Sequence, residues 1–251
     1  MKIFYINQSD VLEITAIKVI HTLKRKTKSV LNRLRRKPVF WGNLRKTVPV
    51  STVFGYDRGN QSVARYYIDQ FISDHSADIQ GKVLEIGDDT YTKRCGSNVS
   101  HSDILHVQEG NPLATIIADL TCADNIPENS FDCIIMPQTL QFIYDFRSAL
   151  MHTFRILKPN GVLLVTLSGI TQISQYDMER WGDYWRFTSL SASKLFEEYF
   201  PIDNITVKSH GNVLSAIAFL EGLSSNELKK KELDISDPNY EVTITVRAIK
   251  N

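Results

Sequence analysis

The segment GKVLEIGDDTYTKRCG, residues 81–96, contains the clearest local pattern in this chain. Val83–Ile86 is an apolar run that ends at Gly87, which is typical of a buried parallel strand followed by a tight turn. In a doubly wound α/β sheet, such a strand and turn open the binding site of a nucleotide-type cofactor. We therefore expect a cofactor to lie over the turn at Gly87.

Two carboxylates, Asp88 and Asp89, follow this glycine. A dinucleotide turn receives a pyrophosphate on bare backbone N–H groups, and like charges about 4 Å apart repel by about 4 kcal/mol at an effective dielectric near 20. The turn is therefore poorly suited to a phosphate, which disfavours a dinucleotide oxidoreductase. It suits a positively charged cofactor without phosphate, such as S-adenosylmethionine (SAM), which has a sulfonium and an amino group.

Strand and helix patterns alternate from residue 62 onward. Strands are predicted at 82–86, 104–107, 115–118, 131–136, 162–167, 205–208 and 240–249, and helices at 62–75, 145–157, 189–199 and 212–223. The sequence KPNG, residues 158–161, is expected to end the second of these helices as a turn. The alternation predicts a doubly wound, mostly parallel sheet with helices on both faces.

The first 50 residues are predicted to form a basic extension, ahead of a main domain over residues 51–251. No acidic residue occurs between Glu13 and Asp57, and apolar residues recur at helical spacing from Val11 to Leu34. The basic residues are Lys18, Lys24, Arg25, Lys26, Lys28, Arg33, Arg35, Arg36, Lys37, Arg45 and Lys46. Three interpretations stay open for residues 11–37: a solvated helix face, an anionic membrane surface, and nucleic acid.

The composition of the 251 residues gives few further restrictions, since the net charge is +1. Cys95, Cys122 and Cys133 are odd in number and show no C-x-x-C spacing, so we expect reduced thiols in a cytoplasmic protein. Neither a secretory signal nor a run of about 20 apolar residues is visible. The six histidines lack the spacing of metal ligands, so no metal site is expected.

Ligands of an open α/β sheet bind beyond the carboxyl ends of its strands. Glu109 follows the second predicted strand and lies 22 residues beyond Gly87, close to the separation expected for a carboxylate that binds a ribose hydroxyl. The candidate ligand-binding residues at the ends of the first six predicted strands, in chain order, are Glu85, Gly87, Asp88 and Asp89; Gln108 and Glu109; Asp119 and Leu120; Gln138, Thr139 and Gln141; Ser168 and Gly169; and His210 and Gly211.

Four motifs resemble the class I SAM-dependent methyltransferases in order and spacing: VLEIG (83–87), ADL (118–120), NSFDCII (129–135) and RILKPNGVLLVT (155–166). The resemblance covers roughly residues 55–250. It implies a seven-stranded Rossmann-like sheet whose last strand is antiparallel. It also implies that Glu85, Gly87 and Asp88 lie near the methionine end of SAM, Glu109 near the ribose, Asp119 and Leu120 at the adenine, and Gln138 on the sulfonium side.

Two further motifs, FGYDRG (54–59) and WGDYWRFT (181–188), resemble bacterial methyltransferases found beside glycosyltransferases in surface-polysaccharide pathways. This narrower resemblance implies O-methylation of a sugar or lipid-linked glycan at the cytoplasmic, inner face of the membrane. The first motif departs from the family pattern E-x-G-x-G-x-G, because Asp89 and Tyr91 replace the later glycines. Either the methionine end of SAM is held differently here, or the site is degraded.

Methyl transfer to a hydroxyl is an in-line displacement that gains from a general base. His210 is the first candidate, because it is predicted at the carboxyl end of the sixth strand, and Asp177 and Asp183 come next.

A substrate pocket is predicted from residues that combine aromatic rings with hydrogen-bonding groups, which suit a sugar, and arginines, which suit phosphate or carboxylate. These residues are Trp181, Tyr184, Trp185 and Arg186, together with Tyr56, Arg58 and Arg65 from the N-terminal side.

Two other functions remain possible from the sequence. One is an RNA methyltransferase that uses the basic extension, although residues 136–139, MPQT, do not match the Asn/Asp-Pro-Pro-aromatic pattern of many amino methyltransferases. The other is a methyltransferase-like binding module that has lost SAM. A steep salt dependence of substrate binding would favour RNA. Calorimetry with SAM would show whether the protein still binds the cofactor.

Overall fold

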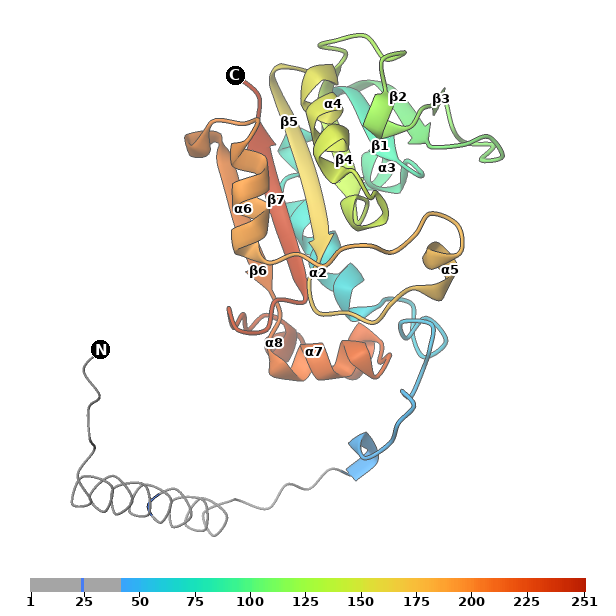
Figure 1. Ribbon diagram of the computed structural model, residues 1–251, viewed down its shortest axis with the longest axis vertical. Coiled ribbons are helices and arrows are strands. Elements are labelled where there is room, and N and C mark those ends of the chain that lie inside the picture. Colours follow the sequence, from blue (N-terminus) through green and yellow to red (C-terminus); the bar gives the residue numbers. More distant parts are fainter. Residues whose placement is uncertain (1–23, 25–41) are drawn as a thin grey trace, which may run out of the picture. The chain divides into compact units, whose positions relative to one another are not determined.

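The computed structural model describes Lys24 and residues 42–251 (Figure 1). The chain divides into two units, Met1–Lys46 and Thr47–Asn251. The described part of the first unit contains the 3-10 turn Gly42–Leu44. Apart from Lys24, the helices predicted between residues 11 and 34, and any binding role of residues 11–37, lie outside the described residues. All elements below belong to the second unit.

One seven-stranded sheet forms the centre of the second unit. Its strands are β1 (Gly81–Ile86), β2 (Val99–His106), β3 (Ile116–Ile117), β4 (Phe131–Pro137), β5 (Leu157–Ser168), β6 (Ile205–His210) and β7 (Thr243–Ile249). They lie in the order β3-β2-β1-β4-β5-β7-β6. Strands β1 to β5 pair in parallel, and β7 runs antiparallel between β5 and β6. The predicted α/β fold class is confirmed.

Helices cover both faces of this sheet. The helices described in this unit are α2 (Val63–Asp74), α3 (Thr90–Cys95), α4 (Phe146–Ile156), α5 (Gln175–Met178), α6 (Ser189–Glu197), α7 (Val213–Leu220) and α8 (Lys230–Leu233). In Figure 1, α4 and α6 lie in front of the strands, and α2 and α3 lie behind them. Ile134 packs in the apolar cluster of the first face and Ile135 in that of the second. Burial on both faces is why the central strands are continuous apolar runs.

The element boundaries differ from the prediction in several places. Strand β2 begins at Val99, five residues before the predicted start at residue 104. Residues 158–161 do not form a separate turn that ends the helix, because β5 already begins at Leu157, which pairs with Phe131. Asn160, at φ +62°, makes the strand irregular there. The last strand begins at Thr243, three residues later than the alternating pattern indicates.

Three negative findings concern the described part of the chain. Cys95, Cys122 and Cys133 form no disulfide. No group of three or more His, Cys, Asp or Glu side chains there could hold a metal ion. None of the helices among those residues has both the length and the apolar character needed to cross a membrane.

Candidate active site

Two neighbouring cavities open at the carboxyl edge of the sheet, and three residues line both: Gln138, Phe142 and Asp177. The larger cavity, of about 620 Å³, is lined by residues 86–87, 105–108, 118–121, 138–139, 142–145, 177, 180–181 and 184. The smaller, of about 300 Å³, is lined by residues 54, 56, 62, 64–65, 68, 137–138, 141–142, 168, 171–172, 174, 177, 183, 186 and 219.

Gly87 forms the wall of the larger cavity at the end of β1. Its φ is +92°, a conformation that favours glycine. Its N–H donates to the Leu105 carbonyl at 3.0 Å, and its own carbonyl accepts from Asn111 Nδ2 at 2.7 Å. Apart from Gly87 and its two chain neighbours, no heavy atom of the described residues lies within 4 Å of the place where a Cβ would stand, so the turn borders open space. Gly87 therefore lies at the wall of a cavity, where the sequence predicts it.

Asp88 and Asp89 do not line either cavity, which corrects the charge argument drawn from the sequence. The exposed Asp88 accepts from the Thr90 N–H at 2.8 Å, and Asp89 pairs with Lys93 at 2.9 Å. Local hydrogen bonds thus turn both carboxylates toward α3 and its surface. The acidic lining of the larger cavity comes from Asp119, Asp145 and Asp177.

Glu85 does not line a cavity. Its side chain is buried and faces α3. Its carboxylate accepts from the N–H groups of Tyr91 at 3.0 Å and Thr92 at 2.7 Å, and from the Thr92 hydroxyl at 2.8 Å. Burial raises the pKa of Glu85, although these hydrogen bonds oppose the shift. Glu85 therefore positions the loop between β1 and α3.

Tyr91, which replaces a family glycine, points away from the cavities and is buried beside α2. Its hydroxyl donates to Asp69 at 2.9 Å and accepts from Arg65 Nη1 at 2.6 Å. The extra bulk at positions 89 and 91 therefore does not fill the space in which a cofactor would bind. Loss of these glycines is thus no sign of a blocked site.

The ends of β2 and β3 provide the next part of the larger cavity. Gln108 lines it, whereas Glu109, the predicted ribose ligand, lies in the exposed turn that follows β2 and does not. Asp119 and the buried Leu120 line the cavity as predicted. The Asp119 carboxylate also accepts from the Thr121 N–H and hydroxyl, at 2.8 and 2.9 Å, so it caps a 3-10 turn as well.

Gln138, directly after β4, stands between the two cavities. Its φ is +50°, which is unusual for a residue other than glycine. The Gln138 N–H donates to the Thr166 carbonyl at 3.0 Å, and Oε1 accepts from the Ser168 hydroxyl and from Gln141 Nε2. Strained residues held in this way concentrate at functional sites.

The two predicted acidic bases are placed differently. Asp177 lines both cavities, and its Oδ2 accepts from the Ser174 hydroxyl at 2.6 Å. Asp183 lines the smaller cavity, but it is buried against Arg186, with contacts of 2.5 and 2.8 Å, and accepts from the Ser174 N–H at 3.0 Å. Asp183 therefore positions the segment between β5 and α6, and Asp177 is the carboxylate available where the two cavities meet.

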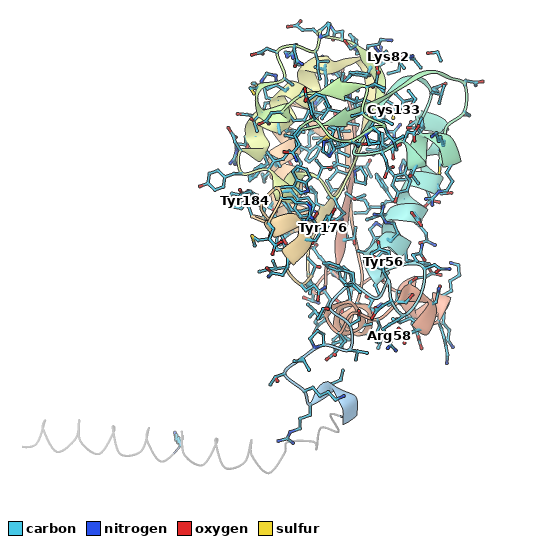
Figure 2. All side chains as sticks on the ribbon, turned by 90° about the vertical axis from the view of Figure 1, so that its right-hand side faces the viewer. Tyr56, Arg58, Lys82, Cys133, Tyr176 and Tyr184 are labelled. Atoms are coloured by element: carbon cyan, nitrogen blue, oxygen red, sulfur yellow. The ribbon has the colours of Figure 1, made fainter. Side chains whose placement is uncertain are left out.

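Only part of the aromatic segment predicted to bind a sugar lies at a cavity. Trp181 and Tyr184 line the larger cavity, with the Trp181 ring edge-on to His106 at 5.4 Å. Tyr184 reaches the surface (Figure 2). Trp185 lines neither cavity, because it packs against Phe146 at 5.3 Å.

Of the residues predicted to complete the substrate pocket from the N-terminal side, only some line a cavity. Tyr56 and Arg65 line the smaller cavity, as does Arg186. Arg58 lines neither, since it pairs with Glu227 through contacts of 2.5 and 3.0 Å. Figure 2 shows Tyr56 and Arg58 at the end of this unit opposite Lys82, the second residue of β1.

His210 is not brought to the cavities, which corrects its selection as the first candidate base. It does end β6, but β7 lies between β5 and β6 and moves that end away from the site. His210 Nε2 contacts the Thr245 hydroxyl at 3.0 Å, and its ring stacks on Tyr67 at 5.6 Å. Burial, helped by Lys208, lowers the pKa of His210.

Some lining residues were missed by the sequence rule. Phe142, Ile143, Tyr144 and Asp145 line the larger cavity together with Arg180. The first four continue the loop beyond Gln138 through a 3-10 turn, Leu140–Phe142, into the N-cap of α4. Following that loop as far as the capping Asp145 would have found them, but no pattern in the sequence indicates Arg180.

Comparison with known proteins adds a family match. Residues 81–165 match the family model described as a methyltransferase domain. No curated protein matches the sequence.

Several solved structures are similar to this chain at low sequence identity. The [4+2]-cyclase SpnF is 13% identical, with 77% of this chain and 84% of that one covered and a TM-score of 0.50. N-methyltransferase NodS from Bradyrhizobium japonicum, in complex with S-adenosyl-L-homocysteine (SAH), is 14% identical, with coverages of 80% and 94% and a TM-score of 0.46. A possible histamine N-methyltransferase from Thermotoga maritima is 16% identical, with coverages of 75% and 92% and a TM-score of 0.48.

The charged and apolar side chains of the larger cavity suit SAM. Its carboxylates Asp119, Asp145 and Asp177 fit a cationic sulfonium and amino group, and Leu120 and Phe142 offer apolar contacts for an adenine ring. The fold, this cavity and the matched domain define a SAM-dependent methyltransferase. The lining of the larger cavity and the matched domain support SAM as its cofactor.

Proposed function

We propose that the protein methylates a hydroxyl group of a sugar or lipid-linked glycan that binds in the smaller cavity. The observation that carries this proposal is the shared wall of Gln138, Phe142 and Asp177. Group transfer requires two ligands to meet at one point, and these residues border both spaces. When bound, SAM supplies an electrophilic methyl group on its sulfonium sulfur.

In this proposal Asp177 takes the proton from the acceptor hydroxyl, because it is the carboxylate that borders both cavities. A chain of contacts holds it: Arg186 pairs with Asp183, Asp183 accepts from the Ser174 N–H, and the Ser174 hydroxyl donates to Asp177. Arg186 and Asp183 are thus positioning residues for the base.

The lining of the smaller cavity supports a sugar-like acceptor. Phe54 and Phe219 present apolar ring surface, while Tyr56, Thr171 and Gln172 offer hydrogen-bonding groups. Rings next to polar groups suit the apolar faces and hydroxyls of a sugar. The basic stretch between Glu13 and Asp57 supports action at an anionic, cytoplasmic membrane surface.

Asp177→Asn tests the base. We expect turnover to fall by about 10²- to 10⁴-fold, the usual contribution of a general base, with SAH affinity changed by no more than a few-fold. Labelled methyl transfer to extracted cell-envelope intermediates measures turnover, and calorimetry measures SAH binding. The matched control is Asp203→Asn, an exposed residue outside both cavities.

Two outcomes would contradict the proposal separately. Full turnover of Asp177→Asn would remove Asp177 from the base role. No measurable heat with SAH at millimolar concentration would instead favour a binding module without the cofactor.

A further inference from the structure

The wall of the smaller cavity contains a guanidinium group without a carboxylate partner. Arg65, on α2, has no Asp or Glu oxygen within 4.0 Å in the described part of the chain. Its Nη1 donates to the Tyr91 hydroxyl at 2.6 Å. The other arginines predicted for the pocket are both paired, Arg58 with Glu227 and Arg186 with Asp183. The Tyr91 hydroxyl donates in turn to Asp69, so the nearest carboxylate is reached only through Tyr91 and does not contact the guanidinium itself. A half-buried charge without a direct counter-ion contact is costly, so this arrangement points to a ligand.

A second, independent observation concerns Gln141, which lines the same cavity and is 2% exposed. Its Nε2 donates to the backbone carbonyl and to Oε1 of Gln138, both at 2.9 Å, and this fixes which way the amide points. Its Oε1 is then buried without a hydrogen-bond partner in the described protein. Buried polar atoms are nearly always paired, so this oxygen calls for a donor from a bound molecule.

The remaining charges of the smaller cavity do not compete for Arg65. Asp183 is engaged by Arg186, and Asp177 lies where the two cavities meet. The cavity therefore offers one oxyanion site at Arg65, and the buried, unpartnered Gln141 Oε1 lies within its wall.

Resting on the proposed function, we infer that the acceptor is an anionic sugar, whose phosphate or carboxylate binds Arg65 and whose hydroxyl donates to Gln141 Oε1. The planar guanidinium matches the oxygens of either anion, because it offers parallel N–H donors. A neutral glycan of the same size would leave Arg65 without a counter-ion.

The test uses full-length protein saturated with SAH, titrated with glucose 1-phosphate, glucuronate and glucose. We expect at least one of the two anions to bind and glucose to bind at least about tenfold more weakly, since a charge-assisted hydrogen bond is lost. Arg65→Gln should weaken the anion by a similar factor. Arg58→Gln, which alters a paired arginine outside the cavity, should leave its affinity unchanged.

The arms of this experiment separate the possible results. Binding of glucose 1-phosphate alone identifies a phosphate, and binding of glucuronate alone identifies a carboxylate. Three results would overturn the inference while SAH still binds. They are equal affinities for glucose and the anions, no binding of any of the three probes, and an unchanged affinity of Arg65→Gln for the anion. Failure of SAH to bind would overturn the proposed function instead.

Arg65→Gln also removes a contact with Tyr91, so thermal melting is measured alongside. If that variant does not fold, Arg65→Lys keeps the positive charge, and the comparison of glucose with the anions on the wild-type protein stands by itself.

Discussion

Individual carboxylates in this protein are distinguished by what they already bind. Glu85 is saturated by three donors from α3, Asp183 by Arg186 and Ser174, and Asp88 by a local N–H. Asp119 and Asp177 also accept local hydrogen bonds, but both line the larger cavity. Position relative to the cavity, more than residue type, therefore selects the acidic groups that can meet a ligand.

Asp119→Ala should weaken SAM binding by about tenfold, since one charge-assisted contact to a ligand is lost. It should also lower the free energy of unfolding by about 1 kcal/mol, because the cap of a 3-10 turn is removed. Calorimetry and thermal melting measure the two effects, with Asp203→Ala as the control. An unchanged affinity for SAM would remove Asp119 from the site.

His210→Gln should leave turnover unchanged and alter the pH dependence of stability. Since burial lowers the pKa of His210 in the fold, the unfolded chain takes up this proton first, near pH 6.5. The stabilisation is complete above that pH and is lost as the pH falls through 6.5 toward the folded pKa. Urea unfolding at pH 7 and pH 5 should therefore show a larger loss for the wild type than for the variant. A fall in turnover would restore His210 as a catalytic candidate.

Among the elements, β7 has the largest effect on the site. Its insertion between β5 and β6 gives the sheet two more paired strands, but it also moves the end of β6 away from the cavities. The long segment between β5 and α6 instead brings Asp177 and Asp183 back over the sheet edge. The acceptor side is thus built by a connection and not by a strand end.

Asn212 joins α7 to α8 and gives a prediction at this scale. Its Oδ1 caps α7 through the N–H groups of Leu214 and Ser215, and its Nδ2 donates to the carbonyls of Glu232 and Ile235 at 2.7 and 2.8 Å. Asn212→Ala should lower the free energy of unfolding by about 2–4 kcal/mol, as both sets of bonds are lost.

Asn212→Ser separates these two contributions, because serine keeps the cap and lacks the Nδ2 donors. Chemical unfolding should place its stability between those of the wild type and Asn212→Ala. Equal stabilities of the two variants would contradict a separate contribution from the cap.

At the scale of the whole molecule, the unit Thr47–Asn251 contains the entire sheet and both cavities. Deleting residues 1–37 should therefore leave SAH affinity unchanged. If the basic stretch binds an anionic membrane, the deletion should reduce sedimentation with anionic vesicles, each basic residue near the surface contributing about 1 kcal/mol. Neutral vesicles are the control.

Undiminished sedimentation of the shortened protein would exclude this role for residues 1–37. Co-purifying RNA, with a steep salt dependence that disappears on deletion, would favour an RNA substrate over a glycan.

The sequence by itself was enough for the fold and for several of the residues that line the larger cavity. Apolar runs and turn residues are local properties of the chain, and in a parallel sheet the strand ends meet at one edge. Gly87, Asp119, Leu120 and Gln138 follow directly from that rule, and each lines the larger cavity.

Only the tertiary structure decided which other polar groups face the cavities. Asp88 and Glu109 follow strand ends as the rule requires, yet the turns carry their side chains elsewhere. His210 was excluded by the position of β7, whereas Asp177 was brought to the cavities by the segment between β5 and α6 in which it lies. Strand order and side-chain direction depend on contacts between distant segments, and such contacts leave no periodic pattern in the sequence.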